Sequence, residues 1–198
     1  MPQNHQILSE NHNTIIVALS ETEIGKVILP PTFHLVDAST GIPVDFLNVH
    51  PTMENEIIAM QYANKINDLM PKFIRQQTWQ NDKGTDYDMM VMERLYPLPF
   101  NHFNEPIRQL MLEIFKLKMK QLHDNKFVHG DFIRPTNYFN RGDKDWMFQN
   151  IVQTESGLRL IDAGFAKIRV KENIEDFIGI LFRERDEIEY FGAYYLSL

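Results

Sequence analysis

The sequence predicts an α+β fold in which a sheet-rich amino half precedes a helix-rich carboxyl half. Short β-branched or aromatic runs, separated by turn residues, follow one another from residue 14 to residue 50. Apolar residues recur at helical spacing in 52–69 and again in 105–124, and a last helical stretch covers roughly 172–189. The 198 residues suit one domain built as two small lobes.

The amino half is expected to contain six strands. The runs TIIVAL, KVIL, FHLVDA and VDFLNV predict four of them within residues 14–49, with turns at Pro30-Pro31 and at residues 39–41. Residues 73–79 and 87–95 predict two more, joined by the polar turn 81–85. Residues 1–13 are polar and are expected to be a loosely attached tail.

Both longer helices have a recognisable start. Thr52 is placed to cap the helix over 52–69, and Asn104 to cap the helix over 105–124, with Pro106 in its first turn. The second helix is expected to bury one apolar face, formed by Ile107, Leu110, Met111, Ile114, Leu117 and Leu122. In the final helix, aromatic residues near position 190 are expected to form a packing patch.

Composition excludes several classes of protein. The chain has no cysteine, which rules out disulfides and zinc–thiolate sites and permits a reducing, cytoplasmic location. A formal net charge of −7 argues against binding nucleic acid through a broad basic face. No run approaches the ~20 apolar residues of a membrane span. We expect a soluble protein with no membrane or nucleic-acid partner, and the sequence leaves its oligomeric state open.

Three short segments have residue types suited to phosphoryl transfer. They are His129-Gly130-Asp131, then residues 134–137 with Arg134 and Asn137, then the segment around Asp162. This reaction needs a carboxylate near the attacking hydroxyl, hard oxygen ligands for Mg²⁺, and positive charge beside the phosphates. Each segment alone is typical of an ordinary turn or cap. Taken together, they favour phosphoryl transfer through the family that they resemble.

These segments resemble those of the protein kinase superfamily. Residues 122–131 (LHDNKFVHGD) and 134–137 (RPTN) resemble its catalytic loop, and residues 160–167 (LIDAGFAK) resemble its magnesium motif. Residues 90–95 (MVMERL) look like the strand that enters its hinge. The likeness covers roughly residues 15–190. It implies a bilobal kinase-like fold with a small β-rich N-lobe (about 14–93), a hinge (94–99) and a shortened helical C-lobe (100–198).

The resemblance also implies roles in catalysis. Asp131 would be the catalytic base or would orient the hydroxyl, and Arg134 would contact the transferred phosphate. Asn137 and Asp162 would hold Mg²⁺. His129 would be architectural, tying the catalytic loop to the magnesium motif.

For ATP, the resemblance implies contacts in the amino half. Met92 would be the gatekeeper, and backbone groups of Glu93 and Leu95 would meet the adenine. Glu56, or else Glu54, would be the helix glutamate that normally pairs with a strand lysine.

The amino half departs from the family at the phosphate-binding elements. Residues 20–27 align with the glycine-rich loop, but only Gly25 and Val27 remain of its pattern, and the acidic residues there would repel a triphosphate. The strand lysine is missing from residues 40–47. Lys26 is a candidate replacement, but strand alternation puts Gly25 and Val27 inward and predicts a solvated Lys26.

The carboxyl half is also reduced. The catalytic loop has one residue more than usual between Asp131 and Asn137, and only KIRVKEN separates the magnesium motif from the final helix. Asp176 is the candidate for the buried aspartate of the helix that normally follows. This shortening resembles RIO-type and KEOPS-complex kinases and minimal kinases of pathogens, which suggests a viral or bacterial origin and, for a pathogen, action inside a host cell.

The favoured function is an atypical ATP- and Mg²⁺-dependent serine/threonine kinase acting on a protein. One alternative, motivated by the missing lysine, is a pseudokinase that acts as a protein-interaction or allosteric module. Another is a small-molecule phosphotransferase of the aminoglycoside or choline type, although those enzymes have a larger carboxyl half that shapes a substrate pocket.

Overall fold

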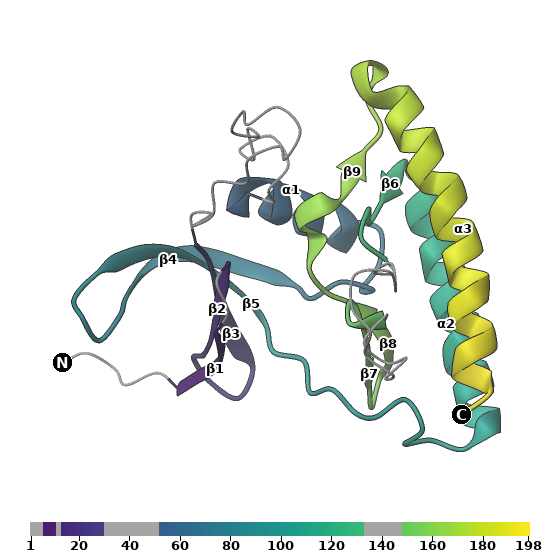
Figure 1. Ribbon diagram of the computed structural model, residues 1–198, viewed down its shortest axis with the longest axis horizontal. Coiled ribbons are helices and arrows are strands. Elements are labelled where there is room, and N and C mark those ends of the chain that lie inside the picture. The colour runs from purple at the N-terminus through teal and green to yellow at the C-terminus, as the bar shows by residue number, and fades with distance from the viewer. Residues whose placement is uncertain (1–5, 11–12, 30–51, 133–147) are drawn as a thin grey trace, which may run out of the picture.

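A computed structural model describes residues 6–10, 13–29, 52–132 and 148–198. Within these residues the chain is mixed α and β, with one antiparallel five-stranded sheet and three α-helices (Figure 1). The order of strands in the sheet is β1-β2-β3-β5-β4. The strands are β1 (Gln6–Glu10), β2 (Thr14–Ala18), β3 (Glu23–Ile28), β4 (Phe73–Gln80) and β5 (Asp86–Glu93).

The helices begin where the caps predict. Helix α1 (Met53–Asn64) starts after Thr52, whose side chain accepts a hydrogen bond from the Asn55 N–H. Helix α2 (Glu105–Asp124) starts after Asn104, which accepts from the Ile107 N–H. Helix α3 (Ile174–Leu196) continues past the predicted end, because Phe191 and Tyr195 are fully buried in an aromatic cluster with Phe100, Phe115 and Phe148. No helix in the described ranges is long and apolar enough to cross a membrane.

The strands β2 to β5 confirm the sequence prediction, and β1 corrects it. Residues 6–10 are not a tail, since they pair with β2 from Gln6↔Ala18 to Glu10↔Ile15. All five residues of β1 are exposed, so the strand is held by main-chain pairing and leaves no apolar alternation to detect. The strands predicted from FHLVDA and VDFLNV lie outside the described residues.

Two small antiparallel pairs position the carboxyl-half segments. Strand β6 (Phe127–Val128) pairs with β9 (Lys167–Ile168), and β7 (Ile151–Thr154) pairs with β8 (Gly157–Leu160). Short 3₁₀ turns follow at η4 (Ala163–Phe165) and η5 (Lys171–Asn173). Strand β6 therefore leads into Asp131, and β8 leads into Asp162.

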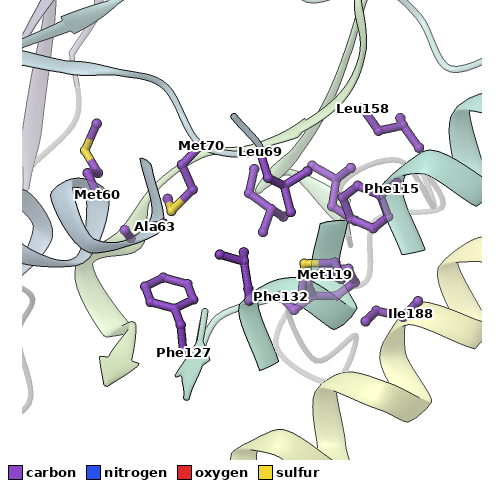
Figure 2. Packing of buried hydrophobic residues seen from close by; sticks show 14 of the residues in the cluster. Met60, Ala63, Leu69, Met70, Phe115, Met119, Phe127, Phe132, Leu158 and Ile188 are labelled. Carbon is purple, nitrogen blue, oxygen red and sulfur yellow. The ribbon is translucent and has the colours of Figure 1, made fainter. Parts of the chain in front are cut away.

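The middle strands β3 and β5 have buried residues on both faces of the sheet. Its α1-facing side joins the main core, where side chains from α1, β6, α2 and α3 converge (Figure 2). Its other side has a second cluster, made of Ile15, Val17, Val27, Trp79, Met89 and Val91. Met89, Met90 and Met92 are all core residues, as the strand pattern predicts, and they divide between the two faces.

Helix α2 buries only part of the face that the sequence predicts, since Leu122 is fully buried and Met111 packs against the core. Ile107, Leu110, Ile114 and Leu117 are exposed, and the buried side contains Arg108, Leu112, Phe115, Met119, Leu122 and His123. Two apolar stripes run along this helix. The inward stripe includes Phe115, whose ring lies 5.8 Å from that of Phe191 in α3, so packing against α3 selects that side.

Candidate functional site

Lys26 lies where three segments of the chain meet. Its Nζ donates to both carboxylate oxygens of Glu56 in α1, at 2.8 Å each, and to Oδ1 of Asp162 at 2.9 Å. Lys26 is 7% exposed and Glu56 is 1% exposed, whereas the Asp162 side chain is partly open to solvent. One ammonium therefore fixes β3, α1 and the segment after β8 relative to one another.

The prediction of a solvated Lys26 is wrong. Strand alternation correctly sets Lys26 on the face opposite Val27, but that face is covered by α1 rather than by water. Gly25 and Val27 lie on the second-cluster side, where a Cβ on Gly25 would come within 2.1 Å of the Met89 sulfur. Gly25 and Val27 therefore lie on the face of the sheet opposite the Lys26 ammonium group.

The residues aligned with the glycine-rich loop form a turn and a strand. The Ser20 hydroxyl accepts from the Thr22 and Glu23 N–H groups, which closes the turn before β3. The Glu23 carboxylate is bound by Arg75, with an Nη2–Oε2 distance of 2.9 Å. Its negative charge is therefore partly compensated by a neighbour on β4.

The charge of Lys26 is stabilised by its surroundings. Burial opposes the charged form, but the carboxylates of Glu56 and Asp162 outweigh it and raise the pKa of Lys26 above its ordinary value. Lys26 is thus a permanently charged ammonium at neutral pH. This is the property needed to bind an anionic group.

The backbone at Asp162 is left-handed, with φ 62° and ψ 68°. Such a conformation is uncommon for a residue other than glycine and typically costs ~1–3 kcal/mol, so it persists where contacts hold it. Contacts with two other segments hold it. The Lys26 ammonium binds the Asp162 side chain, and Nε2 of His129 donates to the Ile161 carbonyl at 2.9 Å. The bond from His129 agrees with its expected architectural role.

Asp131 is oriented by Asn150, a residue that sequence reasoning missed. Asn150 is buried, and its Nδ2 donates to the Asp131 carbonyl at 2.7 Å and to Asp131 Oδ2 at 3.0 Å. The Asn150 carbonyl accepts from the Ile161 N–H at 2.9 Å. Asn150 therefore links Asp131 to the segment that ends at Asp162. A lone asparagine before a hairpin gives no sequence signal of this role.

Two side chains of α3 form hydrogen bonds with the backbone of Gly130. The Gly130 N–H donates to Glu184 Oε1 at 2.6 Å, and the Gly130 carbonyl accepts from Arg183 Nη2 at 2.8 Å. Gly130 has φ 84°, and a Cβ there would lie 2.2 Å from the Phe165 carbonyl oxygen. Glycine is thus required next to Asp131 both by conformation and by space.

Glu184, not Asp176, is the buried acidic residue of α3. Glu184 is 0% exposed and its second oxygen lies 2.9 Å from His123 Nε2. Asp176 is exposed and bonds to Lys167 at 3.0 Å. Asp176 lies in the first turn of α3, before the part of the helix that packs on α2, which explains why the prediction fails.

The remaining predicted residues are placed as follows. Glu56 rather than Glu54 faces Lys26, and Glu54 is exposed. Met92 is buried at the end of β5, the Glu93 carboxylate accepts from Arg159, and Leu95 is half-buried in the connector that follows. Arg134 and Asn137 lie outside the described residues.

The described residues alone do not make a metal cage. No group of three or more His, Cys, Asp or Glu side chains within them is arranged to hold a metal ion. Asp162 does offer carboxylate oxygens at a partly open position. This fits Mg²⁺, which commonly binds one or two carboxylates together with the phosphates of its substrate.

Comparisons with known proteins find matches among solved structures. No protein-family model matches the chain, and no curated protein matches it. Among solved structures, the kinase PK-1 of Cydia pomonella granulovirus is similar, with a TM-score of 0.48 and 15% sequence identity. The match covers 83% of this chain and 52% of that one, so this chain spans about half the length of the granulovirus kinase.

Proposed function

We propose that this chain is an atypical serine/threonine protein kinase with a bilobal kinase-like fold, using ATP and Mg²⁺. The observation that carries the proposal is the contact of Lys26 with Glu56 and Asp162 at 2.8 and 2.9 Å. The resemblance calls for a strand lysine paired with a helix glutamate beside the magnesium aspartate. Lys26 supplies that lysine from β3, although its place in the sequence is not the one that the alignment suggests.

Lys26 would bind the phosphates of ATP. Its raised pKa keeps it charged, and Glu56 holds it in place from α1. Asp162 would hold Mg²⁺, with Asn137 as a second ligand. When bound, Mg²⁺ would offset the negative charge of the phosphates. The adenine would lie against Met92 and the backbone of Glu93 and Leu95.

Asp131 would act on the substrate hydroxyl. In the proposed step the hydroxyl oxygen of a serine or threonine forms a bond to the γ-phosphorus, and the bond from that phosphorus to the departing ADP oxygen breaks. Asp131 takes the hydroxyl proton. Asn150 supports this role because it fixes one oxygen of Asp131 at 3.0 Å, and Arg134 would contact the transferred phosphate.

The main argument for the pseudokinase alternative no longer applies. It rested on the absence of a lysine at the phosphates and on an acidic loop beside them. The buried Lys26 supports nucleotide binding, and the carboxylate of Glu23 is bound by Arg75. No observation favours the small-molecule alternative.

The test is phosphate transfer from radiolabelled ATP to a serine-rich protein in the presence of Mg²⁺. We expect transfer by the wild type and a loss of at least about 10²-fold in D131N and D162A, since both remove a group needed in the transition state. D82N, at an exposed position of the β4–β5 turn, is the matched control and should retain activity. Equal transfer by wild type and D162A would reject the proposal.

Nucleotide binding is measured separately by thermal unfolding. ATP with Mg²⁺ at 100 times its dissociation constant should stabilise the wild type by ~2.7 kcal/mol. A chain that binds ATP but transfers no phosphate would support the pseudokinase alternative instead.

A further inference from the structure

Arg159 is a buried cation that joins the two parts of the chain. It is 7% exposed and lies on β8, opposite Val152. Its guanidinium donates from Nη2 to the Met70 carbonyl at 3.0 Å and from Nε to the Leu69 carbonyl at 3.3 Å. It also donates to Glu93, at 2.8 Å from Nη2 to Oε2 and at 3.3 Å from Nη1 to Oε1.

The acceptors of Arg159 belong to the sheet-bearing part of the chain. Leu69 and Met70 form the connection between α1 and β4, and Glu93 is the last residue of β5. Strand β8 itself lies against α2, in the helical part. One side chain therefore spans from the helical part to the α1–β4 connection and to the end of β5.

Neighbouring bonds reinforce this junction. The Leu160 N–H also donates to the Leu69 carbonyl, at 2.9 Å. Glu93 Oε2 accepts from the Lys72 N–H at 3.0 Å, in addition to the guanidinium. The planar fork of arginine suits several acceptors at once, which an ammonium group does not reproduce.

We propose that Arg159 and Glu93 form a latch that limits how far the sheet-bearing part and the helical part move apart. Any opening at this junction breaks the bonds of Arg159 to Leu69, Met70 and Glu93 together, which opposes the separation. Arg159 is also three residues before Asp162, so the same latch positions the carboxylate that faces Lys26.

The functional consequence rests on the proposed nucleotide site. If ATP lies between Lys26 and the backbone that follows β5, it leaves when the two parts separate. The latch then sets the rate of nucleotide release more than the rate of association, as is usual for changes within one binding site. Arg159 would act as a positioning residue, without touching the reacting atoms.

The first experiment measures nucleotide kinetics by stopped-flow fluorescence with a labelled ADP and Mg²⁺. R159M and E93Q are expected to release the nucleotide at least about tenfold faster than wild type, with association nearly unchanged. R159K should be intermediate. The R159M/E93Q double variant should resemble R159M, because E93Q removes only a contact that R159M already lacks. The control is K116M, which removes an ion pair between Lys116 in α2 and the exposed Glu189 in α3 and should leave release unchanged.

The second experiment does not need a nucleotide. Because the chain contains no cysteine, spin labels at K83C and K120C report the distance between the β4–β5 turn and α2 by pulsed electron resonance. Without nucleotide, we expect a narrow distribution in the latched chain and a broader one after E93Q or R159M.

The two experiments separate the two proposals. A wild type that binds no nucleotide rejects the proposed function, and the distance measurement still decides on the latch. Unchanged distance distributions in both variants overturn the latch, whatever the nucleotide does. E93Q keeps the guanidinium bonds to Leu69 and Met70, so it remains informative if R159M fails to fold.

Discussion

Lys26 and Asp162 are 136 residues apart in the sequence and are joined by an ion pair of 2.9 Å. Because Glu56 binds the same ammonium, two carboxylates share one positive charge. This arrangement leaves an excess of negative charge, which repels a bare triphosphate and attracts a divalent cation. The charge balance of the site therefore favours a nucleotide that arrives together with its metal ion.

Removing the Lys26 charge should affect stability as well as phosphate binding. In K26M, Glu56 stays buried without its partner, and breaking a buried pair in this way typically costs ~3–5 kcal/mol. Replacing both residues in K26M/E56M should restore most of that stability, because the apolar pair has no charge to desolvate. Urea unfolding measures both effects, and ATP should stabilise neither variant.

The matched control for this pair is K120M. Lys120 is exposed and pairs with Asp124 within α2, so its loss should cost less than ~1 kcal/mol. A K26M chain as stable as K120M would contradict the buried contact.

Gly130 should not tolerate a side chain, whereas Gly84 should tolerate one at modest cost. Both have positive φ, 84° and 78°, so alanine strains each backbone by ~1–2 kcal/mol. Only at Gly130 would the new Cβ also meet a backbone oxygen, that of Phe165 at 2.2 Å. Thermal unfolding should therefore show a clearly larger loss for G130A than for G84A. Equal losses would mean that the approach of Phe165 to Gly130 is not as close as the structure has it.

Asn150 should matter more for the rate of transfer than for nucleotide affinity. N150A removes the amide that donates to the Asp131 carboxylate, and a misplaced catalytic group typically lowers kcat by ~10–100-fold. The KM for ATP should change little, since Asn150 lies on the Asp131 side of the site. Steady-state kinetics on a protein substrate separate these two effects.

Asn173 provides the comparison for Asn150. Its side chain also bridges backbone groups, donating to the Ile168 carbonyl and accepting from the Val170 N–H, but it does not contact Asp131. N173A should lower stability without lowering kcat. A similar fall of kcat in both variants would show that the effect of N150A is structural.

The sequence predicts local structure better than it predicts contacts across the chain. The caps Thr52 and Asn104 and the strands β2 to β5 follow from patterns within a few residues. The burial of Lys26 does not, since strand alternation shows that it faces away from Val27 but not that α1 covers that face. Knowing which face is covered requires the packing of α1.

The need to know contacts across the chain also explains why the sequence did not identify Glu184 and Asn150. Glu184 and Asn150 are single polar residues whose role is to bind backbone groups of the Gly130–Asp131 segment. Main-chain acceptors and donors leave no trace in residue type, so the sequence cannot identify such partners. Helix α2 shows a related failure, because two apolar stripes compete and only contact with α3 decides between them.

Glu187 is a carboxyl group that the fold holds in an unfavourable environment. Its Oε2 is buried and has no hydrogen-bond partner among the described residues, and its Oε1 lies 3.6 Å from Arg183 Nε. Burial is the main cause that raises the pKa of Glu187 to about 7. The positive charge of Arg183 lowers this pKa, and the negative charges of Glu184, Asp131 and Asp186 raise it.

E187Q should therefore stabilise the chain at alkaline pH and have little effect at acid pH. The folded chain binds an extra proton between the ordinary value of 4.5 and about 7, so the free energy of unfolding of the wild type falls as pH rises through this window. Glutamine has no proton to lose. After allowance for the partial exposure of Glu187, the free energy of unfolding of E187Q should exceed that of the wild type by ~1–2 kcal/mol at pH 8. Urea unfolding at pH 5 and pH 8 measures this difference, with the exposed E189Q as control. An advantage of E187Q that is the same at both pH values would show that Glu187 does not titrate in this window.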